Sequence, residues 1–193
     1  MMWIKWKQAS KIIPFLLVTM LLFSSVEAKG IEIGLGEISW DTNGKQVKQY
    51  LKGQGFELLE QGKDEEGRQW QKFNNGQLFG FYNEVQLVWQ SQQLAEINIE
   101  SQGVFFLGTE FTYQKLVAQF TDEYGPAAHR DKYMLKIFPG IWVTTTQWIV
   151  NKCGDPPYEV TIVQHDPVDS VGPEAIRSSR ISITFKNIVA NPE

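Results

Sequence analysis

The segment Leu78–Trp89, with the sequence LFGFYNEVQLVW, decides the fold class of this chain. Its apolar residues recur at every second position from Val85 onward, which is the period of a β-strand whose two faces have different surroundings. We therefore predict one long strand here, with Phe81 on the apolar face and Asn83 as a break in the pattern. The QSQQ sequence that follows predicts a turn into another strand at residues 94–99.

Two shorter strands are predicted upstream of this segment, at residues 56–59 and 70–73. A charged turn, KDEEG at 63–67, separates them. The sequence Asn74-Asn75-Gly76 then predicts a tight hairpin turn, because Asn and Gly accept positive φ angles. Strands joined by connections this short pair antiparallel.

Helical periodicity occurs twice in the chain. Val47 and Leu51 give an apolar stripe after the capping sequence DTNG at 41–44, and Gly53 ends this short helix. A second helix is predicted from Thr112, with Leu116 and Phe120 on its apolar face and a stop at 124–126. Further strands are expected at 133–138, 141–150, 158–164 and 181–188, with an exposed loop at 166–179.

These elements predict an α+β protein in which two short helices pack on an antiparallel sheet. Val47 aligns with Leu116, and Leu51 aligns with Phe120 at the same sequence offset. This match favours a tandem helix-then-strands repeat with halves at 29–105 and 106–193. A chance match between two amphipathic helices is the alternative, and the sequence leaves both open.

The first 28 residues have the three parts of a secretory signal peptide. Lys5, Lys7 and Lys11 form a basic region, residues 12–23 are almost entirely apolar, and short side chains precede Ala28. A retained membrane anchor is the alternative, but the apolar run is shorter than the roughly 20 residues that a spanning helix needs. We expect cleavage after residue 28, a single α+β domain at 29–193, and a periplasmic or secreted location.

Composition excludes several classes of protein. The chain has 193 residues and one cysteine, so an intramolecular disulfide scaffold or a multi-cysteine metal site is excluded. It carries 18 basic and 22 acidic side chains, and removing three lysines and one glutamate with the signal makes the net charge −6. This acidic balance argues against nucleic-acid binding. After signal cleavage, no apolar run is long enough to span a membrane.

Several short segments resemble small bacterial envelope modules in which a helix packs on an antiparallel sheet. The segments are GIEIGLG at 30–36 before the first helix, the hairpin at 85–99, the Tyr-Gly-Pro stop at 124–126, and QWI at 147–149 with ISITF at 181–185. The nearest named group is the β-lactamase-inhibitor-protein-like helix-plus-sheet repeat. The resemblance covers most of residues 30–188 and implies that fold and a periplasmic, non-catalytic binding role. It carries over no functional residue, and the single cysteine leaves neither half braced by a disulfide.

Candidate reactive groups are few. Cys153 is the only thiol, and a nearby His129 or His165 could activate it as a nucleophile. An intermolecular disulfide and a structural turn residue are the other interpretations of Cys153. Neither histidine has another ligand at metal-binding spacing, so we predict no metal site and no cofactor. The acidic residues at 64–66 lack the spacing of a calcium loop and are interpreted as a solvated turn.

The predicted function is therefore binding rather than catalysis. Aromatic residues in strands can anchor a protein partner, and the 166–177 loop is a second candidate contact region. We predict an exported binding protein that contacts another protein through a sheet face or a loop, with an inhibitor or immunity protein as one form. A small envelope hydrolase is the alternative, and the oligomeric state stays open. The candidate binding residues are Trp70, Phe81, Trp89, Asp166 and Arg177.

Overall fold

The computed structural model describes residues 38–101, 108–136, 140–152, 156–168 and 179–189. The predicted signal peptide and the segment 30–36 lie outside these residues. Within them the chain forms two helices and eight strands, and the expected α+β class with an antiparallel sheet is confirmed. The sheet is the larger part of the structure.

Helix α2, Gly44–Gly53, is where the sequence predicts a helix. The Asn43 side chain accepts hydrogen bonds from the backbone N–H groups of Lys45 and Gln46, both at 3.1 Å, which caps the first turn. Val47 and Leu51 are the buried residues of the helix. The amphipathic spacing therefore does place these two side chains in the core.

The first helix is followed by four antiparallel strands. Their bounds are β1 Glu57–Lys63, β2 Gln69–Leu78, β3 Phe81–Gln90 and β4 Gln93–Ser101. The turn at 64–68 is the predicted charged turn, in which the Asp64 carboxylate accepts the backbone N–H of Arg68 at 2.8 Å. The predicted turn after β3 is also confirmed, at Ser91 and Gln92.

The predicted hairpin turn at Asn74-Asn75-Gly76 is wrong. Strand β2 continues through these residues to Leu78, and the β2–β3 turn is Phe79-Gly80. Asn75 does adopt a positive φ of 67°, but inside an irregularity of the β2–β3 pairing between Phe73 and Gly76. The predicted long strand 78–89 is therefore divided between two strands.

Asn83 explains where the real turn forms. It is completely buried, and its side-chain nitrogen donates to the carbonyl groups of Leu78 at 2.8 Å and Phe81 at 2.6 Å. These two bonds join both sides of the Phe79-Gly80 turn. The residue that interrupts the apolar pattern of the sequence is thus the one that fixes the hairpin.

The second helix and its strands follow the same order. Their bounds are α3 Thr109–Tyr124, β5 His129–Leu135, β6 Ile141–Val150, β7 Tyr158–Pro167 and β8 Arg180–Asn187. Helix α3 begins earlier than predicted, after Gly108 at a φ of 86°. Thr112 is not its cap, because its hydroxyl donates back to the Gly108 carbonyl at 3.2 Å from within the first turn.

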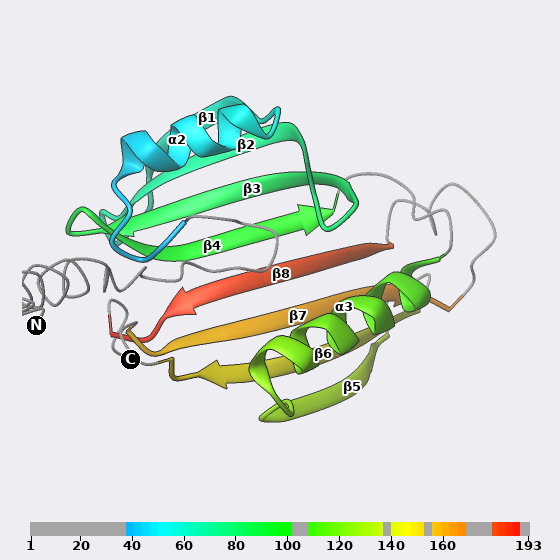
Figure 1. Cartoon of the computed structure of the whole chain (residues 1–193). Helices are drawn as coiled ribbons and strands as arrows, with labels where there is room; N and C mark the ends of the chain where they lie inside the picture. The colour runs from blue at the N-terminus through cyan, green and yellow to red at the C-terminus, as the bar shows by residue number, and fades with distance from the viewer. Residues whose placement is uncertain (1–37, 102–107, 137–139, 153–155, 169–178, 190–193) are drawn as a thin grey trace, which may run out of the picture.

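The eight strands form one antiparallel sheet in the order β1-β2-β3-β4-β8-β7-β6-β5. The two four-stranded sets meet at their last strands, because β4 pairs with β8 in register from Glu96 opposite Lys186 to Glu100 opposite Ser182. Figure 1 shows both helices on the same side of the sheet, α2 over the β1 end and α3 over β6 and β7. The opposite side has no helix over it among the described residues.

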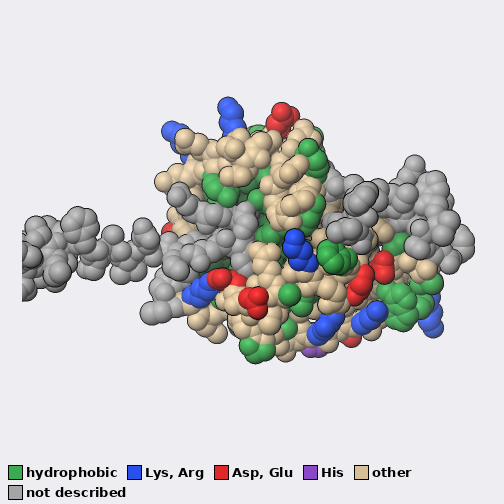
Figure 2. Space-filling model, turned by 45° about the vertical axis from the view of Figure 1, so that its right-hand side comes forward, with side chains coloured by type: hydrophobic (Ala, Val, Ile, Leu, Met, Phe, Trp, Pro, Cys, Tyr) green, Lys and Arg blue, Asp and Glu red, His purple; other side chains and the backbone are tan. Residues whose placement is uncertain are grey.

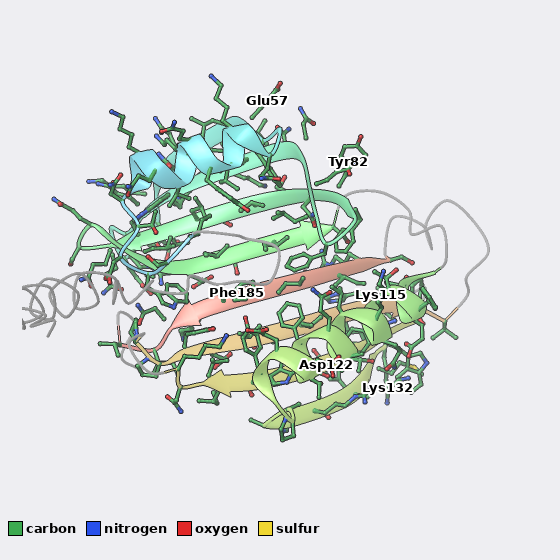
Figure 3. All side chains as sticks on the ribbon, in the orientation of Figure 1. Glu57, Tyr82, Lys115, Asp122, Lys132 and Phe185 are labelled. Carbon is green, nitrogen blue, oxygen red and sulfur yellow. The ribbon has the colours of Figure 1, made fainter. Side chains whose placement is uncertain are left out.

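The core lies between the helices and the sheet. Alternate residues of β3, β4, β6, β7 and β8 point into it together with the buried side chains of both helices. Phe120 of α3 is completely buried, and its ring lies 5.8 Å from that of Trp148 and 6.1 Å from that of Phe185, measured between centroids. Figure 3 shows Phe185 near the middle of the sheet.

Candidate functional site

The sheet side opposite the helices, which we call the open face, has no helix over it among the described residues. Its side chains alternate with those of the core along each strand. A row of uncharged polar side chains crosses five strands in register and is only partly exposed. The row consists of Gln86, Asn98, Thr184, Thr161 and Gln147.

Charged side chains of the open face lie on both sides of this row. The Lys72 ammonium contacts the Glu84 carboxylate at 2.7 Å and that of Glu60 at 3.9 Å. Across β4 and β8, the Arg180 guanidinium contacts the Glu100 carboxylate at 3.3 Å. On β1 to β4, β7 and β8, acidic side chains outnumber basic ones. The acidic residues are Glu60, Glu84, Glu96, Glu100 and Glu159, and the basic ones are Lys72, Arg180 and Lys186.

His165 lies at one end of the open face, beside Arg180. The Arg180 Nε donates to the His165 Nδ1 at 3.3 Å, so this imidazole nitrogen accepts a hydrogen bond. Burial lowers the pKa of His165, and the positive charge of Arg180 lowers it further. Both effects favour the neutral form of the imidazole. Glu100, Arg180 and His165 form a polar chain across three strands rather than a nucleophile–base pair.

Trp70 is the candidate aromatic residue that the structure places on the open face. It is half-buried and lies opposite Val88 on β3 and Gly62 on β1. Its ring covers the Gly62 backbone so closely that a Cβ atom at residue 62 would lie 2.9 Å from the indole. The carboxylate of Glu96 follows on β4 in the same row. The Trp70 ring thus provides apolar surface on the open face, in the same row as the Glu96 carboxylate.

The other two candidate aromatic residues lie on the helix side of the sheet. Trp89 is 7% exposed and belongs to the core, where its indole ring lies beside Gly44 of α2. Phe81 is half-buried and packs against the same core. The sequence places both on one apolar face correctly, but that face is the one covered by helices. Of the three candidate aromatic residues, Trp70 therefore lies on the open face, and Phe81 and Trp89 do not.

The sequence predicts that Asp166 belongs to a loop, and this prediction is wrong. Asp166 belongs to strand β7. It pairs with Trp142 because β6 extends far enough to continue the ladder to Pro167. Burial raises the pKa of Asp166, the nearby Glu110 carboxylate raises it further, and Lys132 opposes the shift. Figure 3 shows Lys132 on β5, near the N-terminal half of α3.

Glu110 of α3 is affected in the opposite direction. Gln114 donates a hydrogen bond to its carboxylate at 2.6 Å, which lowers the pKa of Glu110, and Arg130 and Lys132 lower it as well. The amide of Gln164 also lowers this pKa, although neither of its polar atoms forms a hydrogen bond within 3.5 Å. Two carboxyl groups with opposite pKa shifts therefore lie at this end of the sheet, and the charge of Glu110 contributes to the raised pKa of Asp166.

We expect Asp166→Asn to stabilise the protein at pH 7. The pKa of Asp166 is raised in the folded protein, so the folded state favours the protonated carboxyl. The free energy of unfolding therefore falls as the pH rises through this pKa and the carboxyl ionises. The gain should shrink toward pH 3, below the unfolded-state pKa of about 3.9. Urea unfolding of both proteins at the two pH values checks this. A variant less stable than the wild type at pH 7 would contradict it.

The remaining candidate residues give less information. Cys153 and Arg177 lie outside the described residues, and His129 is exposed at the start of β5. In the described ranges, no three His, Cys, Asp or Glu side chains are grouped so that they could hold a metal ion. No helix in the same ranges is long and apolar enough to cross a membrane.

Comparisons with known proteins give no relative of this chain. No protein-family model matches it, and no curated protein or solved structure matches it either. The arguments about its site therefore depend on its own geometry.

Proposed function

We propose that this chain is an exported, non-catalytic binding protein that presents its open face to a protein partner with a positively charged surface. The observation that carries the proposal is the excess of carboxylates on a sheet face without a helix over it in the described residues. Opposite charge speeds the encounter of two proteins and selects among partners. The signal-like residues 1–28 support an extracytoplasmic location for that encounter.

The arrangement of the charges supports recognition rather than only solvation. Glu84 and Glu100 lie directly opposite each other on β3 and β4, which is unfavourable for like charges. Lys72 and Arg180 compensate this repulsion from the two sides. Glu96 and Glu159 flank Lys186 in the row that begins with Trp70. A cationic partner would contact these carboxylates around an aromatic centre, as protein interfaces often do.

We also infer that the domain consists of two copies of one helix-and-four-strand unit. Each helix is followed by four consecutive antiparallel strands, and the copies join through β4 and β8. Val47 and Leu51 are buried in α2, as Leu116 and Phe120 are in α3, at the offset seen in the sequence. Such a doubling widens the open face to eight strands, which gives a partner more surface than one unit.

The binding experiment compares two double variants that change net charge equally. The purified protein captures a partner from an envelope extract at low salt, and calorimetry then measures affinity for the isolated partner. We expect Glu96→Gln with Glu159→Gln to weaken binding about tenfold, because two interface charge pairs are worth about 1.4 kcal/mol together. The control, Glu65→Gln with Asp122→Asn, lies outside the open face and should change affinity less than about twofold.

A third variant separates apolar contact from charge. Trp70→Ala should weaken binding by about 2 kcal/mol, or roughly 30-fold, if Trp70 is the central anchor. If the captured proteins were on average no more basic than the other proteins of the extract, the proposal would be overturned. The same conclusion would follow if the open-face variant bound as tightly as the wild type.

A small hydrolase is the second candidate, and one observation favours it. The pKa of Glu110 is lowered and that of Asp166 is raised, and a pair of carboxyl groups whose pKa values differ is what acid–base catalysis uses. Asp166→Asn tests this role as well. It should abolish hydrolysis of chromogenic glycosides or esters if the pair is catalytic, whereas a binding protein hydrolyses none of them before or after the substitution.

A further inference from the structure

A groove of about 480 Å³ lies on the helix side of the molecule, at the end of α2 and against β1 and β2. It is distinct from the open face. Its apolar floor consists of Phe56, Leu58 and Phe73, and Lys48 and Lys52 stand on its α2 side.

The floor combines two buried rings with one exposed side chain. Phe56 and Phe73 belong to the core, whereas Leu58 remains 47% exposed. Leu58 pairs directly with Phe73, so both point to the helix side of the sheet. Leu59 next to it is 53% exposed but lies at the register shift between Leu58 and Glu60, and it does not line the groove. The groove therefore exposes apolar surface at one defined position of β1.

The rim is cationic. Helix α2 has the sequence GKQVKQYLKG, with three lysines and no acidic residue. Lys48 and Lys52 are one turn apart, and neither forms an ion pair with another described residue. Figure 2 shows lysine or arginine side chains projecting from the top of the molecule, where α2 lies. Two ammonium groups thus lie beside an apolar floor in an otherwise acidic protein.

The acidic residue of the groove, Glu57, offsets only one of the two lysine charges. Glu57 precedes Leu58, and its carboxylate accepts a hydrogen bond from the Asn75 side-chain nitrogen at 3.3 Å. Figure 3 shows Glu57 at the α2 end of the sheet. The charge of the rim is therefore net positive.

We propose that this groove binds a single-chain anionic amphiphile, such as a fatty acid or an alkyl phosphate. The alkyl chain lies on Phe56, Leu58 and Phe73, and the anionic head group contacts Lys48 and Lys52. Neither part alone accounts for the arrangement, because a neutral apolar ligand would leave both lysines unused and a small anion would leave Leu58 uncovered. Each methylene that enters the groove should strengthen binding by up to about fourfold.

The test uses the purified protein and four probes below their micellar concentrations. Dodecanoate and dodecyl phosphate carry the chain and an anionic head group, dodecyltrimethylammonium carries the chain and a cation, and acetate carries the anion alone. We expect calorimetry to detect binding of the first two at one site per protein and of neither control. Equal binding of the cationic probe, or no binding of dodecanoate and dodecyl phosphate, would overturn the proposal.

Matched variants locate the site. Leu58→Asn should weaken dodecanoate binding at least tenfold, whereas Leu59→Asn, at a similarly exposed neighbour, should leave it unchanged. Lys48→Gln with Lys52→Gln should weaken binding about five- to tenfold and reduce its salt dependence. Lys45→Gln, on the same helix but outside the groove, is the control. All exposed-site variants should keep the wild-type melting temperature.

Two other outcomes also decide against the groove. If Leu59→Asn weakened binding as much as Leu58→Asn, the amphiphile would be adsorbing to apolar surface in general. If the protein bound vesicles containing an anionic phospholipid but not monomeric dodecanoate, the lysines would serve a membrane surface instead.

Discussion

Replacing Phe120 with alanine is expected to lower the free energy of unfolding by about 3–5 kcal/mol. The Phe120 ring is completely buried and lies within 6.1 Å of four other rings, measured between centroids. These belong to Phe79, Tyr124, Trp148 and Phe185. The substitution removes the Phe120 ring from all four ring pairs. It leaves a cavity between α3 and the sheet, because the strands cannot move far enough to fill the space. Urea or thermal unfolding measures the loss.

Phe111 provides the control for this substitution on the same helix. It is 55% exposed, so Phe111→Ala should change the free energy of unfolding by no more than about 0.5 kcal/mol. Similar losses for the two variants would contradict the central position of Phe120. Near-wild-type stability of Phe120→Ala would mean that α3 is not essential to the core.

Gly76→Ala is expected to destabilise the protein by about 1–3 kcal/mol. A Cβ atom at residue 76 would lie 2.1 Å from the ring of Phe56, which is itself 3% exposed. The cause is lack of space rather than backbone conformation, because Gly76 has no positive φ. Chemical denaturation of the variant measures the loss of free energy of unfolding. The loss arises where the buried Phe56 ring packs against β2 at Gly76.

A second substitution separates the clash from other effects. Gly76→Ala should cost less in a Phe56→Ala background, because the ring that the new Cβ meets is then absent. Gly53→Ala is the matched control, since no atom lies within 4 Å of its Cβ position. Alanine there should be neutral or stabilise α2 by up to about 1 kcal/mol. Equal costs of Gly76→Ala in both backgrounds would contradict the proposed clash.

Local patterns predict the helices because their signals are contained in single segments. Val47 and Leu51 are four residues apart, Asn43 precedes them and Gly53 follows, so the sequence of α2 holds its start, its buried face and its end. For α3 the stripe of Leu116 and Phe120 was equally clear. The sequence places the cap of α3 four residues late, at Thr112 instead of Gly108, because Thr112 is a good capping residue by type but its hydroxyl donates to a carbonyl instead.

The β2–β3 hairpin shows what local patterns omit. Asn75 and Gly76 have the residue types of a turn, and Asn75 does adopt the positive φ that suggests one. The position of the turn is decided instead by Asn83, through side-chain bonds to the carbonyl groups of Leu78 and Phe81. The hydrogen bond from Asn83 to Leu78 spans five residues, so a turn propensity, which depends on four consecutive residues, does not include it. The turn could not be located from its own four residues.

The candidate surfaces could be predicted only in part. Alternation in β3 does identify Glu84, Gln86 and Val88 as the face opposite the core, and this signal was present in the sequence. Pairing of β4 with β8, which brings Glu96 beside Lys186, depends on a contact between distant segments. The groove is similar, because Lys52 and Phe73 meet only after the sheet forms. Spacing along the chain contains no such information.

The position of β8 has a consequence for the order in which the sheet can form during synthesis. This strand lies in the interior of the sheet, between β4 and β7, yet it is the last described element along the chain. The sheet therefore cannot be completed until residues 180–187 have emerged from the ribosome. Until then β4 and β7 are incomplete edges, which bind other strands readily.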